Sequence, residues 1–308
     1  QFSRDFFEYK TFNDLIDRNR RPFICINSTD LSLGSQFSFV QSQFDLLYSD
    51  LGEYPIGHAV AASAAFPGLL TAKTLRNYDK GDDYQTPSWI KEEMAQNSKN
   101  RARHAKAREI ESYIKPGRPY IHLTDGGVSD NLGILPILHL FSGVMPNESI
   151  QKALQSGIIK KMVIITVDAK KTEDSPWDSR ANVLGIFKLL TLATTAPMSN
   201  YSEGEITYLT TYMDNLNTLQ GIRDDLTPVL GSEEKVYEQF PELKVPKTDC
   251  TFIEVAFDRL RDDDACTYLN KIPTSFSLSR EQVDRLRESA GRILDQDADF
   301  THLIKTLE

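Results

Sequence analysis

Residues 122–138 read HLTDGGVSDNLGILPIL, an apolar run that ends in a polar, glycine-rich turn and then continues into a second apolar run. The pattern predicts a strand over 120–124 that delivers Asp125 to the carboxyl edge of a sheet, where open α/β sheets bind their ligands. Gly126 and Gly127 predict a tight turn with positive φ angles, and they leave room for another backbone or a substrate to come close.

The same stretch also has a purely structural interpretation. Asn131 can cap the helix that follows, expected over 131–141, whose interior must begin beyond Gly133 and could start at Pro136. Asp-Gly pairs are common turn signals, so an aspartate that only ends a strand and caps a turn explains the pattern as well as a catalytic one. The stretch alone therefore leaves the role of Asp125 open.

A second stretch, residues 58–70, reads HAVAASAAFPGLL and is dominated by small side chains. It predicts a helix over 56–66 against which neighbouring backbones pack tightly. The residues of this stretch that we expect to line a pocket are Ala62, Ser63, Phe66 and Pro67. A close-packed core helix with no role in a site is the alternative.

Short apolar runs alternate with helical patterns, which favours an α/β fold with a mostly parallel central sheet flanked by helices. Residues 162–168 (MVIITVD) are the clearest buried strand, and residues 22–27 (PFICIN) are expected to form another. The other expected elements are strands over 36–40 and 251–257, helices over 89–114 and 201–219, and a final helix that begins with a capping box of Ser279 and Gln282.

Composition limits the classes of function. Hydrophobic residues make up 40% of the 308 residues and charged residues 26%, and the net charge is −9. Binding to a nucleic-acid duplex needs clustered basic charge, so nucleic acid is not an expected partner of the whole chain. The longest stretch without Asp, Glu, Lys or Arg, residues 54–72, contains two prolines and many alanines and is expected to form buried core rather than a membrane span.

The beginning of the chain carries no recognisable targeting signal. It starts at Gln1, without an initiator Met, and enters directly into a pattern typical of folded protein. We expect the natural N-terminus to lie upstream, and the sequence does not fix a compartment.

In their order and separation, the two stretches resemble the patatin-like phospholipase family. Ala62-Ser63-Ala64-Ala65-Phe66-Pro67 matches the family's Ala-Ser-Ala-x-x-Pro segment, and Asp125-Gly126-Gly127 with Asn131 matches its D-G-G/A turn followed by Asn. Further similarity lies in 21–39, 118–133 and 273–278.

The resemblance implies a lipid acyl hydrolase that needs no cofactor. In that family a serine in a G-x-S-x-G elbow attacks the ester and an aspartate alone serves as its base, a role that falls here on Asp125. It also implies that residues 1–245 are the C-terminal portion of a patatin-like catalytic domain. The pattern of the chain itself predicts residues 246–308 as a C-terminal strand-helix extension packed on it, with one domain as the simpler alternative.

The sequence departs from the family's pattern at the nucleophile. No G-x-S-x-G and no glycine-rich oxyanion loop occurs in the 308 residues. Ser63 lacks both flanking glycines, so we interpret it as a packing residue and expect the catalytic serine upstream of Gln1. The alternatives are a non-catalytic module that keeps the fold and a metal-assisted hydrolase that uses Asp125 and Asp130.

Other chemistry-bearing residues give weaker signals. The five histidines and three cysteines show no spacing typical of a metal site. Cys25 is expected to be a buried thiol, whereas Cys250 and Cys266 could pair in an oxidising compartment. Residues 99–108 concentrate basic side chains, which indicate either a solvated helix face or peripheral contact with anionic lipid headgroups.

Overall fold

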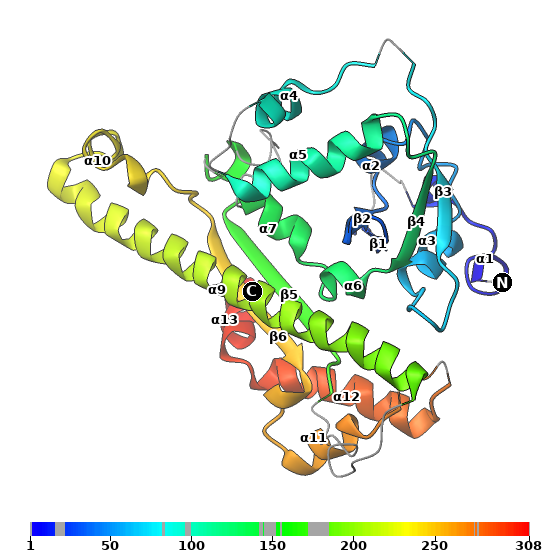
Figure 1. The fold of residues 1–308 in the computed structure, drawn as a ribbon. Helices are drawn as coiled ribbons and strands as arrows, with labels where there is room; N and C mark the ends of the chain where they lie inside the picture. The colour runs from blue at the N-terminus through cyan, green and yellow to red at the C-terminus, as the bar shows by residue number, and fades with distance from the viewer. Residues whose placement is uncertain are drawn as a thin grey trace. The chain divides into compact units, whose positions relative to one another are not determined.

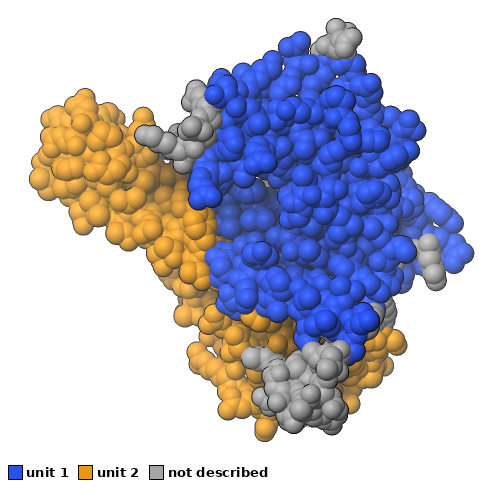
Figure 2. Space-filling model, in the orientation of Figure 1, with its two compact units in different colours: residues 1–147, 184–205 blue, residues 148–183, 206–308 orange. Residues whose placement is uncertain are grey.

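The computed structural model describes residues 2–15, 22–81, 84–95, 100–141, 144, 152–154, 156–171, 185–273, 275 and 277–307. Contacts divide the chain into two compact units (Figure 2): unit 1 comprises residues 1–147 and 184–205, and unit 2 comprises residues 148–183 and 206–308. The expected boundary between 245 and 246 stays a prediction, because units defined by contacts need not be independently folding domains.

Unit 1 contains a four-stranded sheet in the order β2-β1-β4-β3 (Figure 1). Its strands are β1 (Asn27–Asp30), β2 (Ser35–Ser38), β3 (Lys73–Arg76) and β4 (Tyr120–Asp125). Every neighbouring pair is antiparallel. The predicted mostly parallel central sheet is therefore wrong.

The connection between β1 and β2 explains part of this result. Only residues 31–34 separate the two strands, and Gly34 adopts a φ of 65°, in the left-handed region. Such a short turn can join only antiparallel strands, because a parallel pair needs a crossover of a dozen residues or more.

An aromatic core packs against this sheet. Phe37 of β2 contacts Phe39, the residue just after that strand, edge to face, with ring centroids 5.5 Å apart. Both side chains are almost completely buried. Each such side chain contributes about 1.5–3 kcal/mol through its burial. The helical elements of unit 1 are α1 (Phe2–Asp5), η1 (Phe12–Asp14), α2 (Gln41–Asp45), α3 (Ile56–Ser63), α4 (Ser88–Ala95), α5 (Arg101–Ile114), α6 (Gly127–Asp130) and α7 (Leu135–Phe141).

Two of the expected helices, over 56–66 and over 89–114, are shorter in the structure. The first ends at Ser63 rather than at residue 66, and its Ala59 and Ala62 are fully buried, so the prediction of a close-packed helix is confirmed. The predicted single helix over 89–114 is divided between α4 and α5, and residues 96–99 lie outside the described residues.

Helix α9 (Ile186–Leu230) contains the predicted helix over 201–219 and extends beyond it at both ends. Its residues up to Glu205 belong to unit 1 and those from Ile206 to unit 2. Among the helices of the described segments, α9 included, none is both long enough and apolar enough to cross a membrane.

Unit 2 contains one parallel pair, β5 (Lys161–Asp168) with β6 (Asp249–Ala256). The strand predicted at 162–168 is confirmed in position, but its burial on both faces is wrong, since Val167 is 72% exposed. The other elements are α10 (Glu233–Gln239), η2 (Pro241–Leu243), η3 (Phe257–Arg259), α11 (Asp263–Asn270), α12 (Arg280–Gln296) and α13 (Ala298–Leu307). The capping box of Ser279 and Gln282 is confirmed at the start of α12.

The apolar run 22–27 is the clearest failure of the sequence pattern. Residues 22–26 form no strand, and Phe23 is 82% exposed. Cys25, expected to be buried, is an exposed thiol, and Cys250 and Cys266 are free cysteines rather than a pair. An apolar run becomes a buried strand only where neighbouring strands accept its backbone, and pairing begins here at Asn27.

Candidate functional site

The predicted strand ends where the sequence places it, with Asp125 as the last residue of β4. Strand β4 is an inner strand of the sheet, and Asp125 lies opposite Ser28 of β1. The backbone N–H of Asp125 donates a 3.0 Å hydrogen bond to the carbonyl oxygen of Ala65, and the N–H of Gly126 donates one of 3.1 Å to that of Ser63. The D-G-G turn is therefore fixed against the C-terminal end of α3.

The two glycines of the turn are required for space and not for backbone angles. Gly126 has a φ of −62°, and neither glycine is among those with positive φ, so that part of the prediction is wrong. A Cβ atom on Gly126 would lie 2.5 Å from the carbonyl oxygen of Asn27. A Cβ atom on Gly127 would lie 2.7 Å from Cε of Met198 and 2.8 Å from Oδ1 of Asn131. Their predicted role of admitting a neighbouring backbone is confirmed at Gly126.

A cavity of about 520 Å³ opens beside this turn. The residues that line it are Cys25, Ile26, Asn27, Val60, Ser63, Ala64, Asp125, Gly126, Gly127, Asp130, Asn131, Leu132 and Gly133. Its size lies within the range of about 300–1,000 Å³ that is typical of small-ligand sites. Asp125, Gly126, Gly127, Asn131 and Ser63 were all predicted site residues, and the fold brings them together here.

The other expected pocket residues have different positions. Ala62 is fully buried in the aromatic core of unit 1, and Phe66 and Pro67 follow α3 without lining this cavity. Cys25, Ile26 and Asn27 line it although the sequence pattern assigned them to a buried strand. The polar Asn27 at the end of an apolar run was the signal that could have identified this wall.

The carboxylate of Asp125 keeps most of its hydrogen-bonding capacity. Within the described residues it accepts one hydrogen bond, 2.8 Å long, from the backbone N–H of Gly127. Burial raises the pKa of Asp125 above the ordinary aspartate value, and the Gly127 N–H opposes this rise. A partly buried carboxylate with a raised pKa binds a proton more readily, as a general base must.

The cap of the next helix belongs to Asp130 and not to Asn131, which corrects the prediction. Asp130 is 4% exposed, and its carboxylate accepts hydrogen bonds from the backbone N–H groups of Ile134 (3.1 Å) and Leu135 (3.2 Å). The Nε2 amide of Gln36 donates a third bond of 2.6 Å. Burial raises the pKa of Asp130, against the lowering effect of these donors. Asp130 is fully engaged in the fold, whereas Asp125 is not.

Helix α9 contributes residues that the sequence did not suggest. The tip of Met198 lies against Gly127, as described above, and the carboxyl of Glu205 is close enough to Asp130 for their charges to interact. Burial, with a smaller effect from Asp130, raises the pKa of Glu205 to about 7. Its Oε2 atom is buried without a hydrogen-bond partner in the described residues.

Metal chemistry gains no support from this arrangement. Across the described segments, no group of three or more His, Cys, Asp or Glu side chains is placed to hold a metal ion. Asp125 and Asp130 line the same cavity, but the carboxylate oxygens of Asp130 already accept hydrogen bonds from Gln36 and from the backbone at the start of α7.

The basic segment 99–108 coincides largely with the start of α5, and Lys99 lies outside the described residues. Arg103 pairs with Glu93 at 2.8 Å, and Lys106 pairs with Glu109 at 2.6 Å. These two cations therefore serve packing within unit 1, and contact of the segment with lipid headgroups stays a prediction.

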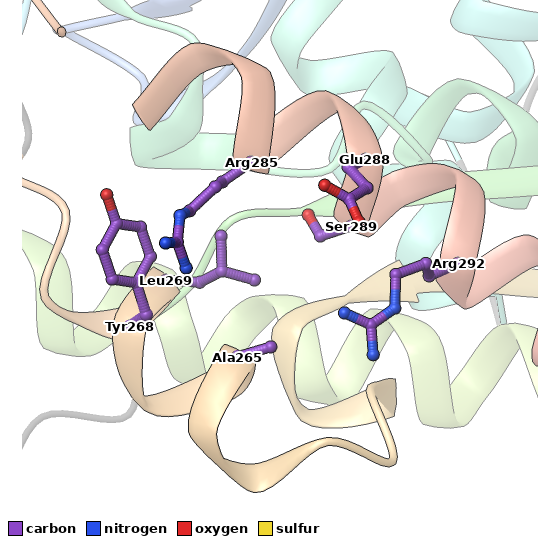
Figure 3. A pocket seen from close by; sticks show the side chains of 7 residues that line it. All are labelled: Ala265, Tyr268, Leu269, Arg285, Glu288, Ser289 and Arg292. Carbon is purple, nitrogen blue, oxygen red and sulfur yellow. The ribbon is translucent and has the colours of Figure 1, made fainter. Parts of the chain in front are cut away.

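A separate hollow of about 240 Å³ lies in unit 2 between α11 and α12 (Figure 3). Its two arginines are already engaged: the guanidinium of Arg285 stacks 4.2 Å from the ring centroid of Tyr268 and pairs with Glu281 at 3.0 Å. Arg292 pairs with Asp262 at 2.8 Å. The hollow is best explained as a junction between two helices.

Comparisons with protein-family models, curated proteins and solved structures give no match to this chain. The resemblance to the patatin-like family therefore stays a prediction that rests on the segments quoted above.

Proposed function

We propose that Asp125 is the general base of a serine acyl hydrolase of the patatin-like type, acting on phospholipids or other lipid esters. The observation that carries the proposal is the position of its carboxylate: at the end of an inner strand, lining a cavity, with a raised pKa and one turn hydrogen bond. The nucleophile in this proposal is a serine outside the 308 residues, since they contain no G-x-S-x-G.

The reaction requires Asp125 to take part in four proton transfers. It accepts the serine proton as the serine oxygen attacks the acyl carbon, and it returns that proton to the departing alcohol when the ester bond breaks. It then accepts a proton from the water that attacks the acyl-serine, and returns it to the serine as the acid leaves. One carboxylate with a free oxygen and a raised proton affinity can perform all four proton transfers in turn.

Asp168 provides a comparison within the same chain. It ends β5 and accepts a 2.8 Å hydrogen bond from the backbone N–H of Lys170, two residues on, just as Asp125 does from Gly127. A strand-ending aspartate thus needs only this bond for its turn. The cavity beside Asp125 is what favours a chemical role over the non-catalytic alternative.

A fluorophosphonate, which reacts covalently with activated serines, tests the proposal in the protein that carries the nucleophile. The proposal predicts labelling of a serine outside these 308 residues, with a rate that Asp125→Asn lowers by about 10²–10⁴-fold. Label on Ser63, or a rate that does not respond to Asp125→Asn, would contradict it. The non-catalytic alternative predicts no labelling in either form.

A further inference from the structure

A second cavity of unit 1, of about 310 Å³, shares no lining residue with the cavity beside Asp125. Its apolar side is formed by Phe44 and Leu47, in and after α2, and by Leu75 of β3. All three are almost completely buried in the core of unit 1, so this side of the cavity is fixed by packing.

The polar side of the same cavity is cationic. Lys73 and Arg76 line it from the two ends of β3, and no acidic side chain is among its lining residues. Neither cation forms an ion pair with a residue that the structure describes, although the chain carries a net charge of −9. The guanidinium of Arg76 lies 5.3 Å from the ring centroid of Tyr78, which restricts its position, and within the described ranges no residue accepts a hydrogen bond from it.

A third polar group is buried and lacks a partner. Tyr54 is among the residues that line this cavity, and its hydroxyl is buried and forms no hydrogen bond with any described residue. Its ring is held by Phe44 at 5.4 Å and by His58 at 5.9 Å between centroids. Burial raises the pKa of Tyr54 to about 12, so the hydroxyl keeps its proton and can donate a hydrogen bond to an anion. Buried polar groups are normally satisfied, and a ligand oxygen would satisfy this one.

We propose that this cavity binds an amphipathic monocarboxylate, with its carboxylate at Lys73, Arg76 and Tyr54 and a short apolar tail against Phe44, Leu47 and Leu75. The proposal goes beyond the acyl hydrolase activity and does not rest on it, because no residue is shared between the two cavities. Charge-assisted hydrogen bonds favour the head group, and the apolar wall favours a tail over a bare anion.

Calorimetric titration of the chain with hexanoate tests the proposal. The expected result is saturable binding at a concentration below about 10 mM, with acetate, 1-hexanol and inorganic phosphate each binding at least about tenfold more weakly. Acetate lacks the tail, hexanol lacks the charge, and phosphate carries charge without an apolar part.

Two variants locate the site. Lys73→Gln and Tyr54→Phe should each weaken hexanoate binding by about tenfold, the effect of one charge-assisted hydrogen bond. Lys305→Gln, which removes an exposed lysine of α13, should not change it. If Lys73→Gln lowers the thermal midpoint, its weaker binding could come from partial unfolding. Tyr54→Phe then provides the test of the site, because it removes only a hydroxyl without a described partner. Absence of saturable hexanoate binding, phosphate binding as tight as hexanoate, or binding that neither variant weakens would overturn the proposal.

Discussion

The backbone N–H of Gly126 donates a 3.1 Å hydrogen bond to the carbonyl oxygen of Ser63, which joins the turn after β4 to the last residue of α3. The bond brings together the two sequence stretches that carry the family resemblance. Its geometry depends on the absence of a side chain at Gly126, because a Cβ atom there would lie 2.5 Å from the carbonyl oxygen of Asn27. Close packing at this turn therefore positions Asp125.

Gly126→Ala should destabilise the protein by about 1–3 kcal/mol, since the backbone of β1 must move to admit the methyl group. Gly127→Ala should cost less, because the atoms that it meets first are the flexible tip of Met198 and the side-chain oxygen of Asn131. Urea unfolding of the three proteins measures the difference.

Gly221→Ala is the matched control for that series. Gly221 lies within α9, and a Cβ atom added there meets nothing within 4 Å, so alanine should stabilise the helix by about 0.5–1 kcal/mol. The explanation by close packing fails if Gly126→Ala is as well tolerated as Gly221→Ala.

Asp130→Asn should lower the free energy of unfolding by about 1–3 kcal/mol. The asparagine keeps one acceptor oxygen but places an amide among donors, where Gln36, Ile134 and Leu135 now donate to a carboxylate. Urea unfolding again provides the measurement. A variant as stable as the wild type would show that Asp130 does not fix the start of α7.

The stability of the fold should depend on pH through Glu205. Its pKa of about 7 in the folded protein lies above the value of about 4.3 in the unfolded chain, so folding favours the protonated form. The stabilisation is complete below about pH 4 and is lost as the pH rises to about 7 and beyond.

Glu205→Gln should therefore be close to the wild type at pH 4 and more stable than the wild type at pH 8, as measured by urea midpoints at both values. Glu238→Gln, at an exposed position of α10, is the control. A stability difference between Glu205→Gln and the wild type that does not change with pH would contradict the assignment.

The positions of β2, β4, β5 and β6 could be predicted from the sequence, whereas β1 lies beyond the predicted run 22–27 and β3 was not predicted. The antiparallel direction of the strands in the four-stranded sheet could not be predicted. Strand β4 and strand β5 lie where their apolar runs predicted them. The alternation of strands and helices suggested parallel neighbours, yet β3 and β4 pair antiparallel although α4 and α5 separate them along the chain. A long connection permits either direction, and long-range packing decides between them. The hairpin of β1 and β2 was not predicted, although Gly34 marks its short turn.

The candidate site could be predicted about as far as its local motif extends. Asp125 and the two glycines belong to one turn, whose sequence indicates its own structure. Met198 and Glu205 come from a helix far along the chain, and nothing in their local sequence indicates proximity to that turn. The exposed position of Cys25 was missed because an apolar run does not specify whether a neighbouring strand exists.

The pH dependence of hydrolysis should report the raised pKa of Asp125 in the protein that carries the nucleophile. Only the ionised carboxylate accepts the serine proton, so kcat/KM should fall as the pH decreases through that pKa. The acid limb should therefore lie above the ordinary aspartate value of about 3.9. An acid limb at or below that value would show that burial does not tune this group.

The central claim is tested most directly by kcat/KM for ester hydrolysis in Asp125→Asn and Asp168→Asn of the protein that carries the nucleophile, with the thermal midpoint measured alongside. Both aspartates end a strand and accept a 2.8 Å turn hydrogen bond from the N–H two residues on. Asparagine keeps an acceptor oxygen for that bond, so both variants lose the charge and basicity of the carboxylate at a similar structural position. General-base assistance is typically worth about 10²–10⁴-fold, and without a histidine to share the work Asp125→Asn should lose about 10⁴-fold or more. Asp168→Asn should keep nearly all activity per folded molecule. If Asp125→Asn lowers the midpoint but keeps its activity per folded molecule, or loses no more activity than Asp168→Asn, then Asp125 is a structural residue and the account is contradicted.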